Sequence, residues 1–165
     1  MIKILIIIFI IFSQKLHADE LKGIPKIVDG DTIYINSHKI RLEGIDAPEI
    51  RQKCKKNFLK ISSMININFQ KEYYCGKHSK EKLKKKIANK LVICKSSGKD
   101  RYKRYLATCF EEKINLNKWM VKSGYAVAYR RYSKIYMADE EFAKENKMGI
   151  WAGSFTRPEK WRKLN

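Results

Sequence analysis

The sequence predicts an α+β domain in which helices close the open side of a small β-barrel. Three short runs rich in Ile, Val and Tyr lie near the start of the folded part, and turn residues separate them. The later part alternates helical patterns with further strands, and no internal repeat or linker divides the chain. A β-meander followed by interleaved helices and strands is typical of this class.

The first strands are expected at 24–28, 31–36 and 39–45, because "DGD" and "NSHK" supply the turns between them. The segment 50–76 is irregular and basic, and we expect an inserted loop or a short helix there. Its part 55–74 could reshape a substrate entrance, but a surface loop is the simpler interpretation.

Helical patterns dominate the rest of the chain. Leu83, Ile87 and Leu91 recur at helical spacing among lysines, Gly124 suits a helix end, and Ser133 can cap a helix. The helices are expected at 77–92, 115–123 and 133–149, and a further strand pair at 91–95 and 104–110. The tail "GIWAGSFTRPEKWRKLN" is expected to fold back on the body.

The first 18 residues have the layout of an export signal. "MIK" is a short positive start, "ILIIIFIIF" an apolar core, and "SQKLHA" a polar stretch that ends at Ala18. The apolar run is shorter than the roughly 20 residues of a membrane-spanning helix. We therefore expect a signal peptide over 1–18 and one domain over 19–165, in the periplasm or outside the cell. No stable membrane association is expected after cleavage, although an uncleaved anchor is the alternative.

The chain is strongly basic, with 36 Lys and Arg against 17 Asp and Glu and a formal net charge of +19. Such a field favours polyanions, of which nucleic acid is the commonest. A lysine-rich surface that only keeps the protein soluble is the alternative. The hydrophobic content of 44% excludes a disordered chain.

Four cysteines in a small exported chain favour two disulfides. No C-x-x-C occurs and the histidines are scattered, which argues against a zinc site. Three pairings are possible by arithmetic. Cys94 and Cys109 flank an expected hairpin, which favours Cys94–Cys109 and leaves Cys54–Cys75.

Hard divalent cations bind carboxylate and carbonyl oxygens, and Asp31, Asp46 and Glu49 lie on adjacent pieces of the meander. "DGD" is also a good turn, so the spacing alone leaves a metal site and a structural role both open. Strict strand alternation places Arg41 and Asp46 on opposite faces, unless Gly44 forms a bulge that resets it.

Two arginines add a second indication. Arg41 lies mid-strand among apolar neighbours, and Arg104 lies where the chain enters another strand. Each is either a partner in a structural ion pair or a planar fork for an anion. Phosphodiester cleavage needs cations on the phosphate, donors for the charge of the transition state, and a way to activate water. Two arginines, two or three carboxylates and one hard metal would meet that need.

Three blocks of the sequence are "VDGDTI", "RLEGIDAPE" and "DRYKRYLA". In this order and at these separations, they resemble the signature blocks of the staphylococcal nuclease (thermonuclease) family. The similarity covers about residues 24–153. Exported, cysteine-containing bacterial members are the most similar, through "VIC", "LATC" and "GIWAGSF". The resemblance implies a five-stranded OB-type β-barrel with about three helices.

The resemblance also implies the composition of the site. Asp31 and Asp46 match the family's Ca²⁺ ligands, and Ala47 stands where the family offers a backbone carbonyl to the metal. Glu49 matches the glutamate that lies near the metal, with water as a possible link, and is usually assigned as the general base.

The remaining matches concern the substrate. Arg41 and Arg104 match the two arginines that bind the phosphate and its transition state. Tyr102 matches a tyrosine at the phosphate end of the nucleotide, and Tyr129 an aromatic residue of the nucleotide pocket. Many members have glycine where Lys103 stands, which places an extra charge beside the phosphate.

These matches imply a secreted, Ca²⁺-dependent nuclease that acts on DNA and RNA as a monomer and leaves 3′-phosphates. A catalytically inactive OB-type nucleic-acid-binding module is the alternative. Degenerate members usually lack one of the carboxylates or arginines, and none is missing here.

Overall fold

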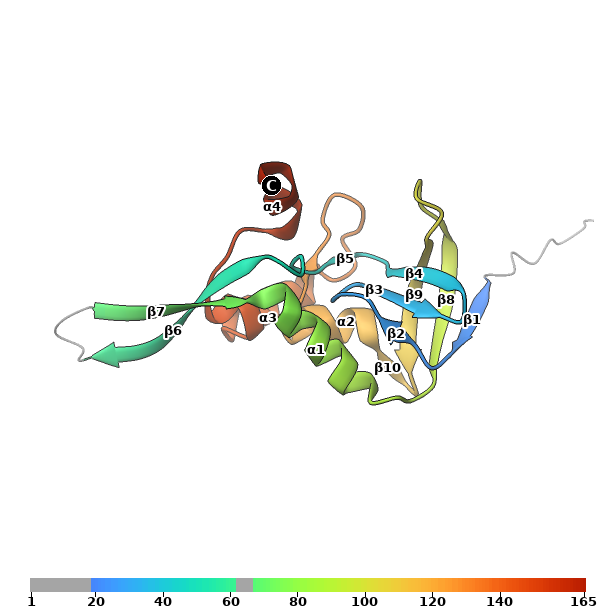
Figure 1. The fold of residues 1–165 in the computed structure, drawn as a ribbon, viewed down its shortest axis with the longest axis horizontal. Coiled ribbons are helices and arrows are strands. Elements are labelled where there is room, and N and C mark those ends of the chain that lie inside the picture. The colour runs from blue at the N-terminus through green and yellow to red at the C-terminus, as the bar shows by residue number, and fades with distance from the viewer. Residues whose placement is uncertain (1–18, 62–66) are drawn as a thin grey trace, which may run out of the picture.

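The computed structural model describes residues 19–61 and 67–165, so the signal predicted over 1–18 lies outside the described part (Figure 1). No helix of the described part is long and apolar enough to cross a membrane. The strands are β1 (Glu20–Gly23), β2 (Lys26–Ile27), β3 (Thr32–Ile35), β4 (His38–Leu42), β5 (Ile45–Asp46), β6 (Lys53–Ile61), β7 (Ile67–Tyr74), β8 (Val92–Lys99), β9 (Tyr105–Glu111), β10 (Ile114–Asn115), β11 (Val127–Ala128) and β12 (Gly153–Ser154). The helices are α1 (Cys75–Ile87), α2 (Leu116–Lys122), α3 (Met137–Glu145), the 3₁₀ turn η1 (Gly149–Ala152) and α4 (Pro158–Leu164).

The main sheet brings the separate sequence blocks together. Its strand order is β1-β8-β9-β4-β3-β2, with β10 beside β9. β4 and β9 run parallel, and their register places Arg41 opposite Leu106. The chain segment that carries Arg104 therefore lies beside the segment that carries Arg41.

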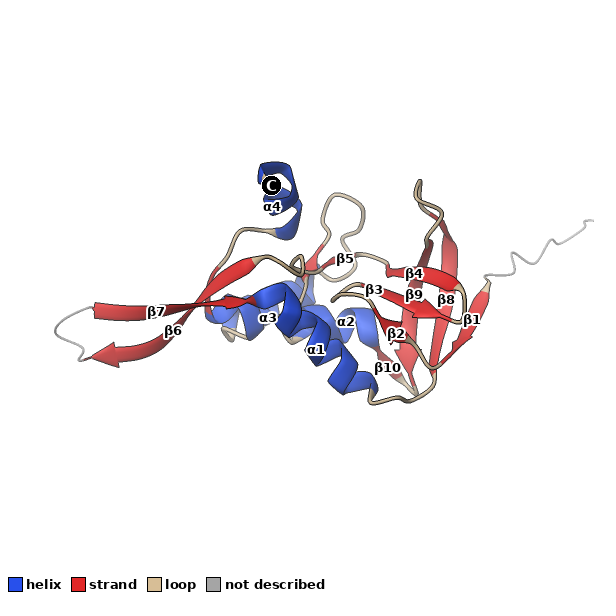
Figure 2. Cartoon of the chain, viewed as in Figure 1, coloured by secondary structure: helices blue, strands red, loops and turns tan. Residues whose placement is uncertain are grey.

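Helices cover one face of this sheet (Figure 2). Apolar side chains of β3 and β4 pack against α1 and α2, and the largest of them are fully buried. Ile33, Ile40 and Leu42 come from the two strands, Leu83 comes from α1, and Met120 comes from α2. The predicted α+β, OB-type class is confirmed. The main sheet of the described residues has seven strands instead of the five expected. The described residues also form four α-helices instead of about three, because the tail adds α4.

The expectation of a loop or short helix within 50–76 is wrong. β6 and β7 form a long antiparallel hairpin that projects from the body (Figure 1). β12 pairs with the base of the hairpin, with Gly153 opposite Lys56. A Cβ on Gly153 would lie 1.8 Å from the carbonyl oxygen of Lys55, so only glycine allows this close approach.

Both predicted disulfides are confirmed, and the described part contains no free cysteine. Cys94–Cys109 joins β8 to β9 inside the core. Cys54–Cys75 joins the start of β6 to the first residue of α1. The second bridge therefore fixes the base of the hairpin against the helix that covers the sheet.

Candidate active site

A cavity of about 700 Å³ lies between the ends of β3 and β4, the turn before β9, and α4. Most of the residues predicted for the site line it: Asp31, Arg41, Ala47, Glu49, Tyr102, Arg104 and Tyr129. Asp46 lies behind this wall and is hydrogen-bonded to Arg41. Lys103 is exposed and does not line the cavity.

Arg41 bridges the two aspartates. Its Nη1 donates to Asp31 Oδ1 at 2.8 Å, and its Nη2 donates to Asp46 Oδ1 at 3.0 Å. Asp31 is 4% exposed and Asp46 is 1% exposed, so each carboxylate depends on such partners. The two predicted metal ligands therefore lie on either side of one guanidinium.

A turn at Gly44 makes this contact possible. β4 ends before the turn and β5 begins after it, and Gly44 has a φ of 77°. This left-handed conformation favours glycine, and a Cβ here would lie 3.0 Å from the ring of Tyr136. Simple strand alternation does not extend from Arg41 to Asp46, and the turn directs Asp46 back to Arg41.

The candidate cation site consists of oxygen atoms. Within the described ranges, no three acidic, His or Cys side chains form a metal-holding group, so the backbone carbonyl of Ala47 would have to contribute. A carboxylate has about four lone-pair positions. Asp31 accepts hydrogen bonds from Arg41, Thr32 and the N–H of Ala47, and Asp46 accepts them from two arginines. Lone pairs remain on both carboxylates, and this donor set fits a hard cation such as Ca²⁺.

Arg104 reaches the cavity from the turn before β9. Its Nε donates to Asp100 Oδ2 at 2.8 Å. Asp100 Oδ1 accepts from the backbone N–H groups of Tyr102 at 2.9 Å and Arg104 at 3.0 Å. Lys103 has a φ of 62°, a conformation that favours glycine. Asp100 therefore organises the turn that presents Arg104, a role that the sequence did not indicate.

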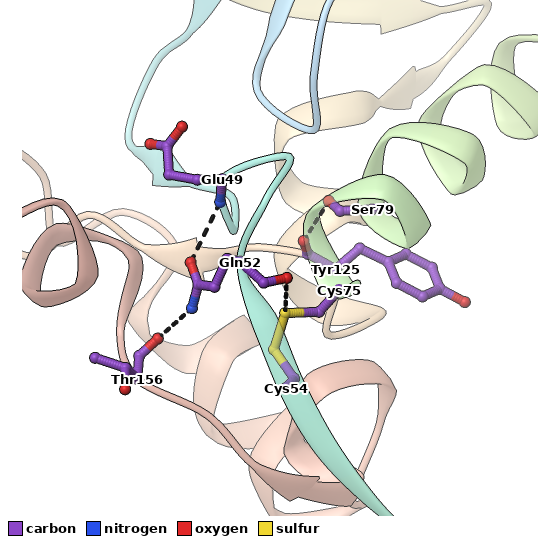
Figure 3. The surroundings of a disulfide bond; sticks show 7 residues. All are labelled: Glu49, Gln52, Cys54, Cys75, Ser79, Tyr125 and Thr156. Atoms are coloured by element: carbon purple, nitrogen blue, oxygen red, sulfur yellow. Dashed lines mark hydrogen bonds between the residues drawn. A yellow bond between two sulfur atoms is a disulfide. The ribbon is translucent and has the colours of Figure 1, made fainter. Parts of the chain in front are cut away.

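Gln52 links Glu49 to two distant parts of the chain (Figure 3). The backbone N–H of Glu49 donates to Gln52 Oε1 at 3.2 Å, and Gln52 Nε2 donates to the carbonyl of Thr156 at 2.6 Å. The carbonyl of Gln52 accepts from the N–H of Cys75 at 3.1 Å, beside the Cys54–Cys75 bridge. Because Gln52 is fully buried, it ties the backbone at Glu49 to both the disulfide and the C-terminal segment.

Arg162 on α4 is a residue of the cavity that the sequence did not identify. Its Nη1 donates to Glu49 Oε1 at 2.8 Å, and its Nη2 donates to Asp46 Oδ2 at 2.9 Å. Burial lowers the pKa of Arg162, but hydrogen bonds to Asp46 and Glu49 and their charges outweigh burial and raise it above its ordinary value. The tail folds back on the body as predicted, but no motif indicated where its arginine would lie.

Three tyrosines form an aromatic side of the cavity. The Tyr129 ring centroid lies 5.8 Å from Cζ of Arg41, and the Tyr132 ring lies edge-on to it at 4.8 Å. Tyr102 and Tyr132 are 64% and 70% exposed. Exposed aromatic faces beside arginines can stack planar groups while the arginines bind an anion. Tyr132 was not predicted from the sequence, although its nearness to Tyr129 in the chain could have identified it.

Burial raises the pKa of two carboxyl groups at or behind the acidic side of the cavity. Burial, and then the charge of Asp31, raise the pKa of Asp29 to about 6. Burial is also the largest cause that raises the pKa of Asp46; the hydrogen bond from Arg162 opposes it, and the charge of Asp31 adds to it. The cavity therefore has one side with carboxylates, which favour cations, and another with Arg104, which favours anions.

A family model and several known proteins are similar to this chain. A family model described as "Staphylococcal nuclease homologue" matches residues 39–153. The chain is 34% identical over 167 residues to an "Uncharacterized endonuclease" of Haemophilus influenzae, and the aligned region covers 96% of this chain and 82% of that protein. It is 26% identical over 177 residues to a "Micrococcal nuclease" of Shigella flexneri, with coverage of 96% and 89%. It is 33% identical over 137 residues to the "Succinoglycan biosynthesis protein ExoI" of Rhizobium meliloti, with coverage of 81% and 66%.

Proposed function

The chain belongs to the family of staphylococcal nuclease homologues, and from this premise we propose that it is an exported, Ca²⁺-dependent nuclease. It hydrolyses DNA and RNA with little sequence preference, and it acts as a monomer in the periplasm or outside the cell. One observation carries the proposal: the acidic and basic groups that phosphodiester cleavage requires converge on one cavity. Asp31, Arg41, Glu49 and Arg104 line it, and Asp46 lies directly behind it on Arg41.

The two arginines bind the scissile phosphate. Arg41 lies at the acidic side of the cavity and Arg104 at the turn before β9, so a phosphate between them would be contacted from two directions. Planar guanidinium groups suit the oxygens of a five-coordinate phosphorus, whose charge exceeds that of the ground state. When bound by Asp31, Asp46 and the carbonyl of Ala47, Ca²⁺ supplies further positive charge at the phosphate.

Glu49 accepts the proton of the attacking water. Its side chain is 37% exposed and therefore accessible to water, unlike the buried Asp46. The water oxygen bonds to phosphorus in line with the 5′-oxygen, whose bond to phosphorus breaks, and the product retains a 3′-phosphate. Tyr102, Tyr129 and Tyr132 stack against the nucleoside, which explains the low sequence preference, because every base has a planar face.

Plasmid DNA and an RNA transcript, incubated with the purified protein, are expected to be degraded with Ca²⁺ and to remain intact with a chelator. The cation is required because it supplies positive charge at the phosphate, whereas Arg41 and Arg104 are already paired with carboxylates. Gel electrophoresis measures the fragments, and end-group labelling checks for 3′-phosphates.

The inactive binding module gives the opposite result in the same experiment. It would retard both nucleic acids on a native gel and cleave neither. Absence of cleavage with Ca²⁺ and with every other divalent cation tested would therefore refute the enzyme and leave the binding module.

Removal of the Cys54–Cys75 bridge is expected to lower the cleavage rate about 10-fold, because it loosens the Gln52 contacts that position Glu49. The test compares Cys54→Ser/Cys75→Ser with Cys94→Ser/Cys109→Ser at a temperature at which circular dichroism shows both variants folded. The second variant lacks a core bridge away from Glu49 and should keep a nearly native rate. Equal rates in the two variants would contradict the link between this disulfide and the site.

A further inference from the structure

The C-terminal arm, residues 153–165, is fixed to the body before it reaches the cavity. β12 pairs with β6, and the carbonyl of Thr156 accepts from the buried Gln52. Arg157 Nη2 donates to the carbonyl of Ala128 at 3.1 Å and to Glu140 Oε1 at 2.9 Å, and Pro158 is buried. These contacts set where α4 begins, so Arg162 does not reach the cavity as part of a loose tail.

Ion pairs connect α4 to the body, in addition to the buried Pro158 at its first position. Figure 1 shows α4 standing clear of the other helices. Arg162 pairs with Asp46 and Glu49, and Glu159 pairs with Arg131 at 3.5 Å. Arg162 is therefore the residue of this helix that contacts the acidic side of the cavity.

Arg162 completes an alternating row of charged side chains. The order of contacts is Asp31, Arg41, Asp46, Arg162 and Glu49, so each arginine lies between two carboxylates. Each guanidinium uses one Nη on one carboxylate and the other Nη on the next. Because the guanidinium is planar and rigid, the row fixes the distance between its carboxylates.

Glu49 depends on this row for its side-chain position. Among the described residues, Arg162 is the one hydrogen-bond partner of its carboxylate, through Oε1. The side chain is otherwise partly exposed and would rotate in solvent. Oε2 has no partner in the described part of the chain and stays available to a water molecule.

We propose that Arg162 is a third arginine of the active site, a positioning residue that holds Glu49 beside Asp46. The proposal rests on the proposed function, because it assigns Glu49 the proton of the attacking water. A misplacement of about 1 Å at a reacting group can reduce the rate about 100-fold, so an unheld Glu49 would be a poor base.

Arg162→Ala is expected to lower kcat about 10- to 100-fold with little change in KM, because substrate phosphate binding stays with Arg41 and Arg104. Arg162→Lys should recover part of the loss, and added methylguanidinium should partly rescue Arg162→Ala. Lys160→Ala is the matched control, since it removes the same charge from an exposed position of the same helix. Its kcat should stay native without any response to methylguanidinium. Thermal unfolding should show that all three variants are folded.

A double-mutant cycle tests whether Arg162 acts through Glu49. In a Glu49→Gln background the Arg162→Ala change should have almost no further effect on kcat, because the group that it positions is already inactive. An undiminished loss in that background would overturn the proposal, and so would a native kcat for Arg162→Ala. Faster cleavage by Arg162→Ala would also overturn it, since α4 would then obstruct the site. Each of these results presumes cleavage by the unaltered protein, whose absence would instead refute the proposed function.

Discussion

Arg104→Ala is expected to lower kcat about 10³-fold and to leave the stability of the protein nearly native. The loss is large because an arginine that meets a transferring phosphoryl group in the transition state supplies a rate factor of about 10³ or more. The fold should tolerate the change because the partner of Arg104 is local: its side chain contacts Asp100 in the same turn. Backbone hydrogen bonds between residues 100 and 104 also hold that turn without the guanidinium.

Single-turnover cleavage and thermal unfolding of the same preparation measure the two effects. Lys113→Ala is the matched control, because it removes one positive charge from an exposed turn outside the cavity lining. If Arg104→Ala cleaved at a near-native rate, the assignment of Arg104 to the phosphate would be wrong. If both variants lost the same small factor, Arg104 would contribute only to the overall positive field.

Arg41→Ala is expected to abolish cleavage and also to destabilise the fold by about 3–5 kcal/mol in the absence of Ca²⁺. The reason is that Arg41 is the shared partner of two buried carboxylates, whose side chains are 5% and 1% exposed. Without Arg41, Asp31 and Asp46 would face each other, and among the described residues Arg162 is the one other ion-pair partner of these two carboxylates. The resemblance assigns both arginines to the phosphate, but the structure also places Arg41 between two buried carboxylates as their ion-pair partner.

Chemical denaturation with chelator and with Ca²⁺ separates these roles. Ca²⁺ should restore much of the stability of Arg41→Ala, because a cation bound by the native state replaces the missing charge and stabilises that state by mass action. It should not restore cleavage. The double variant Arg41→Ala/Asp46→Asn is expected to be more stable in chelator than Arg41→Ala alone, since one of the unpaired carboxylates is gone. Native stability of Arg41→Ala in chelator would contradict the ion-pair role.

Local patterns predicted the parts of the fold that face the core. The meander and α1 follow from apolar side chains at strand or helix spacing, because burial enforces the spacing. The helix expected from Ser133 onward begins only at Met137, and the side chains that it buries are Glu140 and Ala143. The β6–β7 hairpin projects from the body, and Lys53, Lys55 and Lys56 at its base are exposed. Where no core requires apolar and polar residues to alternate, a strand has only a weak sequence pattern. The sequence therefore predicted a loop or a short helix for this segment.

Local patterns likewise predicted some residues of the candidate site and not others. Asp31, Arg41, Asp46 and Glu49 lie within one meander, so short-range spacing and family blocks locate them together. The contact between Arg162 and Glu49 joins residues separated by 113 positions and exists only because the C-terminal arm docks on β6 and Gln52. No local pattern reports such a docking. The turn at Gly44 also could not be distinguished from a bulge until the direction of Asp46 was known.

A nuclease with little sequence preference endangers the genome of the cell that synthesises it. Inside most cells thiols are kept reduced, so Cys54 and Cys75 would stay separate there and pair only in an oxidising compartment. Until then Gln52 would hold the backbone of Glu49 less firmly, because the bridge lies beside its contact with Cys75. Under the proposed export, the site would reach its full rate only after the chain has left the compartment that contains the chromosome. The disulfide at the base of the hairpin would therefore reduce the nuclease activity to which the genome of the producer is exposed.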